Sequence, residues 1–163
     1  MTSPVSKAGI SQETPEIDPW RLVRYKCDPA HTAQEESLFA LANGTLGVRG
    51  GLEEDDSASH GVFLGGVWER MPIDYHERFP GFARSSDTRV PVADGTHIRL
   101  RLGDAMLDLQ HGERLAFKRE LDLRQGCYRQ AMTWRASSGA IVEIIAQRLV
   151  ALEIPGLLAI RYR

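Results

Sequence analysis

The sequence is poor in cysteine, in surplus charge and in long apolar runs. Its 163 residues contain only two cysteines, Cys27 and Cys127, which lie far apart and show no metal-type spacing. A scaffold held together by several disulfides is therefore excluded. We predict two reduced thiols in a cytoplasmic protein, with one disulfide between them as the alternative.

The small net charge also excludes classes of partner. A formal charge of -2, without a basic tract, gives no general affinity for nucleic acid or for an anionic membrane. No window approaches the roughly 20 apolar residues that cross a bilayer. Residues 1–17 are rich in Ser, Thr, Pro and Glu and lack the apolar segment of a secretory signal. We therefore expect a disordered lead over 1–17, a cytoplasmic location, and no nucleic-acid or membrane partner.

The remaining composition is that of an ordinary globular protein. With 42% hydrophobic and 26% charged residues, the chain can build one domain with a real core, which we place at 18–163. Trp20 and Leu22 are the first credible anchors of that core.

Strand patterns dominate the second half of the chain. Residues 97–102 alternate polar and apolar side chains, a Gly-Asp turn follows, and 105–109 resume the alternation, which predicts a hairpin. Tyr128, Gln130, Met132 and Trp134 fall on one face of a further strand, and Ser137-Ser138-Gly139 forms a turn. Residues 141–149 and 157–162 are two more predicted strands.

The stretch 36–50 is the most informative part of the chain. An apolar run meets Asn43-Gly44 and a second, glycine-broken apolar run follows, which predicts strand, type I′ turn and strand. Residues 29–42 also have a helix-like composition, which competes with the first strand. Together the strands predict an all-β fold, an antiparallel β-sandwich. Because the chain stops at Arg161-Tyr162-Arg163, inside a predicted strand, we expect the domain to be incomplete at its C-terminus.

Several segments resemble glycoside hydrolase family 65, whose members are mainly disaccharide phosphorylases, with some hydrolases. The resemblance runs through Glu36–Gly50, Gly61–Glu69, Pro72-Ile73 with Tyr75 and Glu77, Gly81-Phe82-Ala83, Leu121–Gly126, Arg129, Trp134, Gly139 and Arg148-Leu149-Val150. It implies the N-terminal β-sandwich domain that, in the family, precedes a linker and a catalytic (α/α)6 barrel. No part of this chain resembles the barrel.

The resemblance implies a non-catalytic domain of an enzyme that acts on α-glucosidic bonds by inverting cleavage. One carboxylic acid of the barrel would protonate the leaving oxygen while inorganic phosphate, or water in the hydrolases, attacks from the opposite face. We expect no catalytic residue in this chain and no cofactor, with phosphate as a co-substrate of the parent enzyme. The expected partners are a disaccharide, the missing barrel and a second copy in a homodimer. The alternative is a stand-alone carbohydrate-binding or structural module.

Two local clusters have both a chemical and a plainer interpretation. The acidic run Glu53-Glu54-Asp55-Asp56 could hold a hard cation, but it lacks spaced ligands, so we predict a solvated loop and no metal site. The glycine-rich segment 44–51 could cradle phosphate, but it lacks the ending of a P-loop, and hairpin geometry explains its glycines better. Its arginine, Arg49, is predicted to contact a neighbouring domain.

Residues 69–92 carry the strongest candidate for a contribution to substrate. Tyr75, His76, Arg78 and Phe82 are the candidate residues for the rim of a substrate pocket, since aromatic rings stack on sugars and cations bind hydroxyls or phosphate. The interpretation that we favour is a loop that packs its aromatic side chains against its own sandwich or the barrel, with the pocket rim as the alternative. Met71 stands where the resembling subset has tryptophan.

Overall fold

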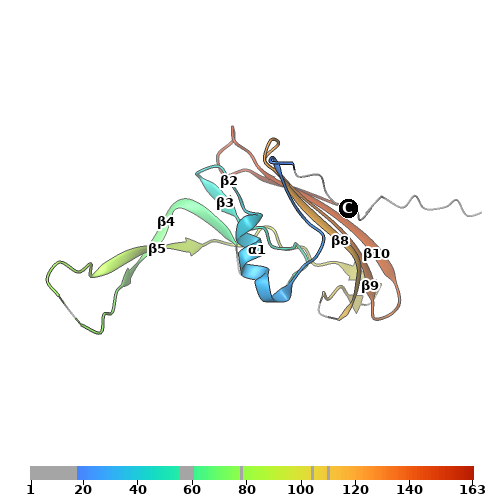
Figure 1. Ribbon diagram of the computed structural model, residues 1–163, viewed down its shortest axis with the longest axis horizontal. Helices are drawn as coiled ribbons and strands as arrows, with labels where there is room; N and C mark the ends of the chain where they lie inside the picture. The colour runs from blue at the N-terminus through green and yellow to red at the C-terminus, as the bar shows by residue number, and fades with distance from the viewer. Residues whose placement is uncertain (1–17, 56–60, 78, 104, 110) are drawn as a thin grey trace, which may run out of the picture.

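The computed structural model describes residues 18–55, 61–77, 79–103, 105–109 and 111–163. Two antiparallel sheets and one short helix make up most of this part of the chain (Figure 1). The fold is the predicted all-β sandwich. The predicted disordered lead, 1–17, lies outside the described residues.

The larger sheet has five strands in the order β1-β8-β9-β10-β11. The bounds are Arg21–Arg24 for β1, Gly112–Asp122 for β8, Cys127–Ala136 for β9, Ile141–Val150 for β10 and Leu158–Tyr162 for β11. The face predicted for Tyr128, Gln130, Met132 and Trp134 is confirmed, because all four side chains are buried. The strands predicted at 141–149 and 157–162 are confirmed as β10 and β11.

The smaller sheet has four strands in the order β2-β3-β4-β5. Its bounds are Leu41–Ala42 for β2, Leu46–Val48 for β3, Val62–Pro72 for β4 and Ser85–Pro91 for β5. The last two strands form a long hairpin that projects away from the body of the molecule (Figure 1). A two-stranded pair, β6 (Arg101–Leu102) with β7 (Ala105–Met106), completes the strands.

The core lies between the sheets and under the loops that connect them. Val150 of β10 packs with Leu46, Val48 and Val62 of the smaller sheet, which joins the two sheets directly. A second cluster gathers Phe117, Met132, Trp134 and Ile144 from the larger sheet beneath Leu52. Burying one such side chain stabilises the fold by about 1.5–3 kcal/mol. The two clusters therefore hold the sheets against each other.

The strand predicted to precede Asn43 is wrong over most of its length. A single-turn 3-10 helix, η1 (Pro29–His31), leads into the helix α1 (Thr32–Leu38), and only Leu41–Ala42 pairs as a strand. The helix-like composition of 29–42 therefore prevails, because Phe39 is buried against Leu121 and Tyr128 from the helix end.

The turn at Asn43-Gly44 is real but is not type I′. A type I′ turn needs a positive φ at Asn43, and among the described residues only glycines have one. The Asn43 carboxamide oxygen instead accepts hydrogen bonds from the amides of Thr45 and Leu46, at 3.0 and 2.8 Å, and Gly44 takes φ 87°. The side chain thus closes a longer loop.

The hairpin predicted at 97–109 is shorter than expected. Only residues 101–102 and 105–106 are strands, although Leu107 still donates to the Leu100 carbonyl at 2.7 Å. Ile98 donates instead to the carbonyl of Glu53 at 2.7 Å, so this half of the segment bonds to the acidic run.

The two cysteines are free thiols, as predicted, and both are partly buried. Within the described ranges, no helix is long and apolar enough to cross a membrane.

Candidate functional site

The projecting β4–β5 hairpin carries an open aromatic surface at its tip. Its strands pair in register from Trp68 with Arg89 to Pro72 with Ser85, and the Ile73 amide extends the ladder to the Arg84 carbonyl at 3.1 Å. Residues 74–77 and 79–83 then form the described part of the hairpin loop. The position of this loop follows from the length of the two strands.

A bulge near the base of the hairpin sets its direction. The register shifts between Phe63 and Trp68, where Gly66 has φ 84°. Such a conformation strains any residue with a Cβ, and bulges bend a strand. The neighbouring Gly65 packs on the turn of β2 and β3, where a Cβ would lie 2.9 Å from the Gly44 carbonyl. The two glycines therefore anchor and bend β4 before it leaves the body.

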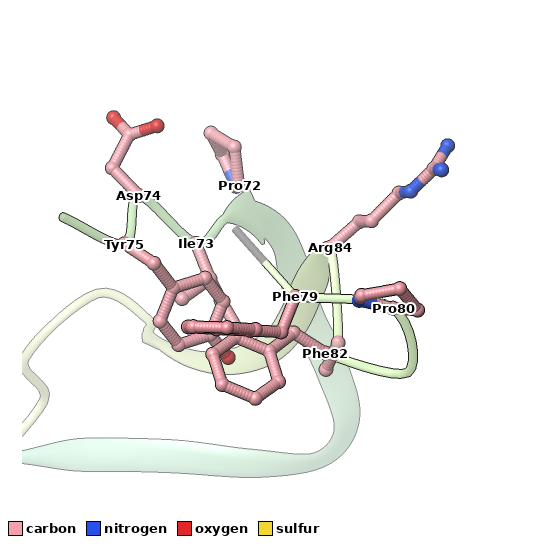
Figure 2. A pocket seen from close by; sticks show the side chains of 9 residues that line it. Pro72, Ile73, Asp74, Tyr75, Phe79, Pro80, Phe82 and Arg84 are labelled. Carbon is pink, nitrogen blue, oxygen red and sulfur yellow. The ribbon is translucent and has the colours of Figure 1, made fainter. Parts of the chain in front are cut away.

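Three aromatic rings meet at the tip of the hairpin. The rings of Tyr75 and Phe82 lie 4.9 Å apart at 52°, and those of Phe79 and Phe82 lie 5.5 Å apart at 58°. Figure 2 shows the three rings gathered on one side of the loop. They remain 40%, 55% and 48% exposed for Tyr75, Phe79 and Phe82, so the cluster is not covered by the body of the domain.

The rings line an open hollow of about 700 Å³, which we call the hairpin hollow. Its lining comprises Pro72, Ile73, Asp74, Tyr75, Phe79, Pro80, Phe82, Ala83 and Arg84. The Arg84 guanidinium and the Asp74 carboxylate extend away from the rings (Figure 2). Exposed rings with charged groups at the margin suit a sugar face or an apolar partner surface.

The structure brings together two of the four predicted rim residues. Tyr75 and Phe82 are in ring contact in the hairpin hollow. His76 is exposed in the same loop but does not line the hollow, and Arg78 lies outside the described residues. Phe79 is the main member that the predicted rim lacked, and its signal was the density of aromatic residues in this loop. The role of these residues as a substrate rim stays a prediction.

Arg49 binds within its own chain. Its guanidinium donates to the Ala33 carbonyl at 2.7 Å and lies 3.4 Å from the Glu36 carboxylate, which is buried. It therefore holds α1 against β3. The contact of Arg49 with another domain stays a prediction.

The acidic run is not a solvated loop, contrary to the prediction. Glu53 is 0% exposed, and its carboxylate accepts hydrogen bonds from Nε and Nη2 of Arg148 at 3.1 and 2.5 Å. Arg148 is equally buried and also donates to the carbonyls of Arg49 and Gly51. The run turns inward because β10 supplies a buried cation opposite it. Asp56 lies outside the described residues.

Glu54 lies in the same buried cluster, where no described residue pairs a cation with it. Its two carboxylate oxygens accept from the Tyr162 hydroxyl at 2.7 Å and from the Gln130 amide at 3.1 Å. Burial, together with the charge of Glu53, raises the pKa of Glu54 above its ordinary value. Burial and the Glu54 carboxylate likewise raise the pKa of Tyr162. These side chains form a structural network that couples β9, β10 and β11 to the 51–54 segment.

No metal centre is formed by the residues that the structure describes. No group of three or more His, Cys, Asp or Glu side chains converges there. The buried acids instead meet arginine, tyrosine and glutamine, which are partners typical of a structural network.

Similar proteins identify the class of the domain. A solved structure of a candidate kojibiose phosphorylase from the human microbiome superposes with a TM-score of 0.71 and 29% identity, over 84% of this chain and 18% of that chain. The α,α-trehalose phosphorylase of Thermoanaerobacter brockii is 33% identical over 79% of the chain and 17% of its own length. The maltose phosphorylase of Bacillus subtilis is 30% identical over 94% of the chain and 20% of its own length.

An uncharacterized glycosyl hydrolase of Mycobacterium tuberculosis is 35% identical over 94% of the chain. Residues 22–163 match the family model described as "Glycosyl hydrolase family 65, N-terminal domain". The chain therefore belongs to glycosyl hydrolase family 65, as its N-terminal domain. It spans about a fifth of the length of these relatives, 20% for the mycobacterial protein.

Proposed function

We propose that this chain is the non-catalytic N-terminal domain of a family 65 disaccharide phosphorylase or hydrolase. The observation that carries the proposal is the match over 22–163 together with relatives that are phosphorylases. The substrate class is a disaccharide with an α-glucosidic bond, and inorganic phosphate is the co-substrate of the parent enzyme in a phosphorylase. The protein acts in the cytoplasm.

The chemistry proposed for the parent enzyme needs one carboxylic acid that protonates the leaving oxygen. In an inverting reaction, phosphate or water attacks the opposite face of the sugar, and a phosphorylase needs no second carboxylate as a base. The buried acids of this domain support a structural role instead, since Glu53, Glu36 and Glu120 each pair with an arginine. The acid would therefore come from a catalytic barrel.

The hairpin gives the domain a way to contribute to catalysis without a reacting group. Its tip carries Tyr75, Phe79 and Phe82 away from the body, in reach of a neighbouring domain or a second copy in a homodimer. There the rings would rim the substrate pocket, for which His76 and Arg78 are also predicted. Ordering a loop over a pocket positions substrate and excludes water.

Activity assays of two proteins test the proposal. The chain of residues 1–163 and the full protein of its natural reading frame are each incubated with maltose, trehalose, kojibiose and nigerose, with and without phosphate. We expect glucose or glucose 1-phosphate only from the full protein. Turnover by residues 1–163 alone would contradict a non-catalytic role.

A stand-alone carbohydrate-binding module is the second candidate, and the exposed rings of the hairpin hollow favour it. The length of the natural reading frame distinguishes the parent enzyme from the stand-alone module. Several hundred residues of helical hairpins after Arg163 support the parent enzyme, whereas a stop codon with saturable disaccharide binding by the chain supports the module.

A further inference from the structure

We propose that a second hollow, beside β8, binds a phosphate group, either free or on a small sugar. This β8 hollow measures about 500 Å³ and is lined by Tyr25, Lys26, Cys27, Arg114, Leu115, Ala116 and Phe117. It lies on the body of the domain, and none of its lining residues belongs to the hairpin hollow. The inference concerns binding alone and does not depend on the proposed function.

The topology explains why this hollow exists. β1 pairs with β8 only from Arg119 to Asp122, and the chain then leaves the sheet at Tyr25. The first half of β8 therefore has a strand neighbour on one side only, β9. The segment 25–27 runs past this half of β8 and forms the other wall (Figure 1). A register shift between Arg114 and Ala116 re-aims the side chains there.

The charge in the β8 hollow has one sign. Lys26 and Arg114 line it, no acidic residue does, and neither cation forms an ion pair with a described residue. The adjacent acid, Glu113, is engaged by Arg135 of β9 at 2.6 Å. Other buried or half-buried arginines differ, since Arg119 pairs with Glu35 and Arg148 with Glu53. No described acid neutralises these two cations, which favours an anionic ligand in the hollow.

One buried donor of this hollow lacks an acceptor. Nε of Arg114, which lines the hollow, has no hydrogen-bond partner among the described residues. The Arg114 guanidinium rests over the Phe117 ring at 5.2 Å, which fixes one of its faces. Buried donors are normally satisfied, so an unsatisfied guanidinium donor at a cationic hollow favours a ligand rich in acceptor oxygens.

Phosphate matches these groups better than chloride or a single carboxylate does. A guanidinium offers paired N–H donors in the geometry of a phosphate edge, and an ammonium adds a mobile point charge. Two cations balance the roughly two negative charges of a phosphate monoester near neutral pH. The Tyr25 hydroxyl supplies a further donor, and the apolar wall of Leu115 and Phe117 leaves room for a sugar.

An NMR titration of the 163-residue chain tests the site. Inorganic phosphate and glucose 1-phosphate are added separately at constant ionic strength, with chloride as the reference anion. We expect saturable shifts of the amides at 25–27 and 114–117 with both phosphates and not with chloride. Tighter binding of glucose 1-phosphate assigns a sugar phosphate to the site, and tighter binding of inorganic phosphate assigns the free anion.

Three variants make the test specific. Arg114→Gln and Lys26→Gln should each weaken binding about tenfold, the loss typical of one charge-assisted hydrogen bond. Arg124→Gln, which removes a cation stacked on Trp20 past the opposite end of β8, should bind as the wild type does. Lys26 is exposed, so Lys26→Gln stays informative even if Arg114→Gln unfolds.

Clear outcomes would overturn the proposal. Shifts that do not saturate, equal responses to phosphate and chloride, or undiminished binding by Lys26→Gln would each exclude a phosphate site at this hollow. An equal loss in Arg124→Gln would show that only the net charge matters. None of these results bears on catalysis, so the proposed function stands or falls separately.

Discussion

The buried side of the larger sheet and the tip of the β4–β5 hairpin both depart from the usual distribution, in which charged residues are exposed and aromatic residues are buried. The sheet buries Glu53, Glu54 and Arg148, whereas the hairpin exposes Tyr75, Phe79 and Phe82. In the sheet, each charge finds partners at hydrogen-bond distance, so its burial serves the fold. At the hairpin, the rings contact one another and leave much of their surface open, which is typical of a contact surface. The difference separates residues that hold the domain together from residues that meet something else.

Breaking the central buried ion pair should have the largest effect. Arg148→Met leaves the Glu53 carboxylate buried without its cation, and we expect a loss of about 3–5 kcal/mol in the free energy of unfolding. Urea unfolding monitored by tryptophan fluorescence measures it. Arg135→Met, which breaks the exposed pair with Glu113, is the control and should cost less than about 1 kcal/mol. Equal losses would show that the buried pair is not special.

Adding a methyl group at Gly50, where the segment after β3 contacts the end of α1, should have the next largest effect on stability. A Cβ at Gly50 would overlap the Phe39 Cβ and lie 2.7 Å from the Phe39 carbonyl oxygen. Gly50→Ala should therefore cost about 1–3 kcal/mol, because backbone must move. Gly95→Ala meets nothing within 4 Å and should change stability by less than about 1 kcal/mol. Thermal melts of the two variants measure both changes in stability, and equal changes would contradict the predicted clash at Gly50.

The raised pKa of Glu54 should make the stability of the protein depend on pH. The pKa of Glu54 is raised in the folded state, so the folded protein binds this proton more tightly than the unfolded chain does. Wild-type stability should thus fall as pH rises from the ordinary value of 4.5 through the raised pKa. Glu54→Gln should lack this component and gain stability relative to the wild type over that window. Parallel curves for the two proteins would refute the raised pKa.

The smallest effect on stability is expected at the hairpin tip. Phe82→Ala removes a ring that is 48% exposed and should cost about 1 kcal/mol or less in unfolding free energy. In the full enzyme the same change should lower kcat/KM about fivefold to tenfold if the rings rim the substrate pocket. Trp68→Ala, on the same hairpin but outside the hollow, is the matched control. A large loss of stability without a loss of activity would assign Phe82 to the fold instead.

Local patterns predicted the strands better than they predicted the fate of charged residues. The alternation over 128–134 and the turn at 137–139 are properties of neighbouring residues, and the structure confirms both. The burial of Glu53 and Glu54 depends on Arg148 and Tyr162, which arrive from β10 and β11. A run of four acids carries no sign of such distant partners. The helix over 32–38 was predicted only as a competitor of a strand for a similar reason, since its anchor Phe39 packs on β8 and β9.

The candidate site was predictable only in part. The aromatic density of residues 75–82 indicated a surface for binding, but the ring contacts depend on the turn that joins Phe79 to Phe82. The β8 hollow gave no signal in the sequence, because Tyr25–Cys27 and Arg114–Phe117 meet only after β1 has paired with the far half of β8.

The glycine bulge at the base of the hairpin has a consequence for engineering. Because Gly65 and Gly66 anchor β4 before the tip begins, and because the aromatic cluster is built from residues of the hairpin alone, residues 72–84 form a self-contained cassette. Such a cassette can be exchanged with the matching segment of a relative without rebuilding the interior. Chimeras of this kind would transplant whatever preference the tip confers, and would leave the scaffold that presents it intact.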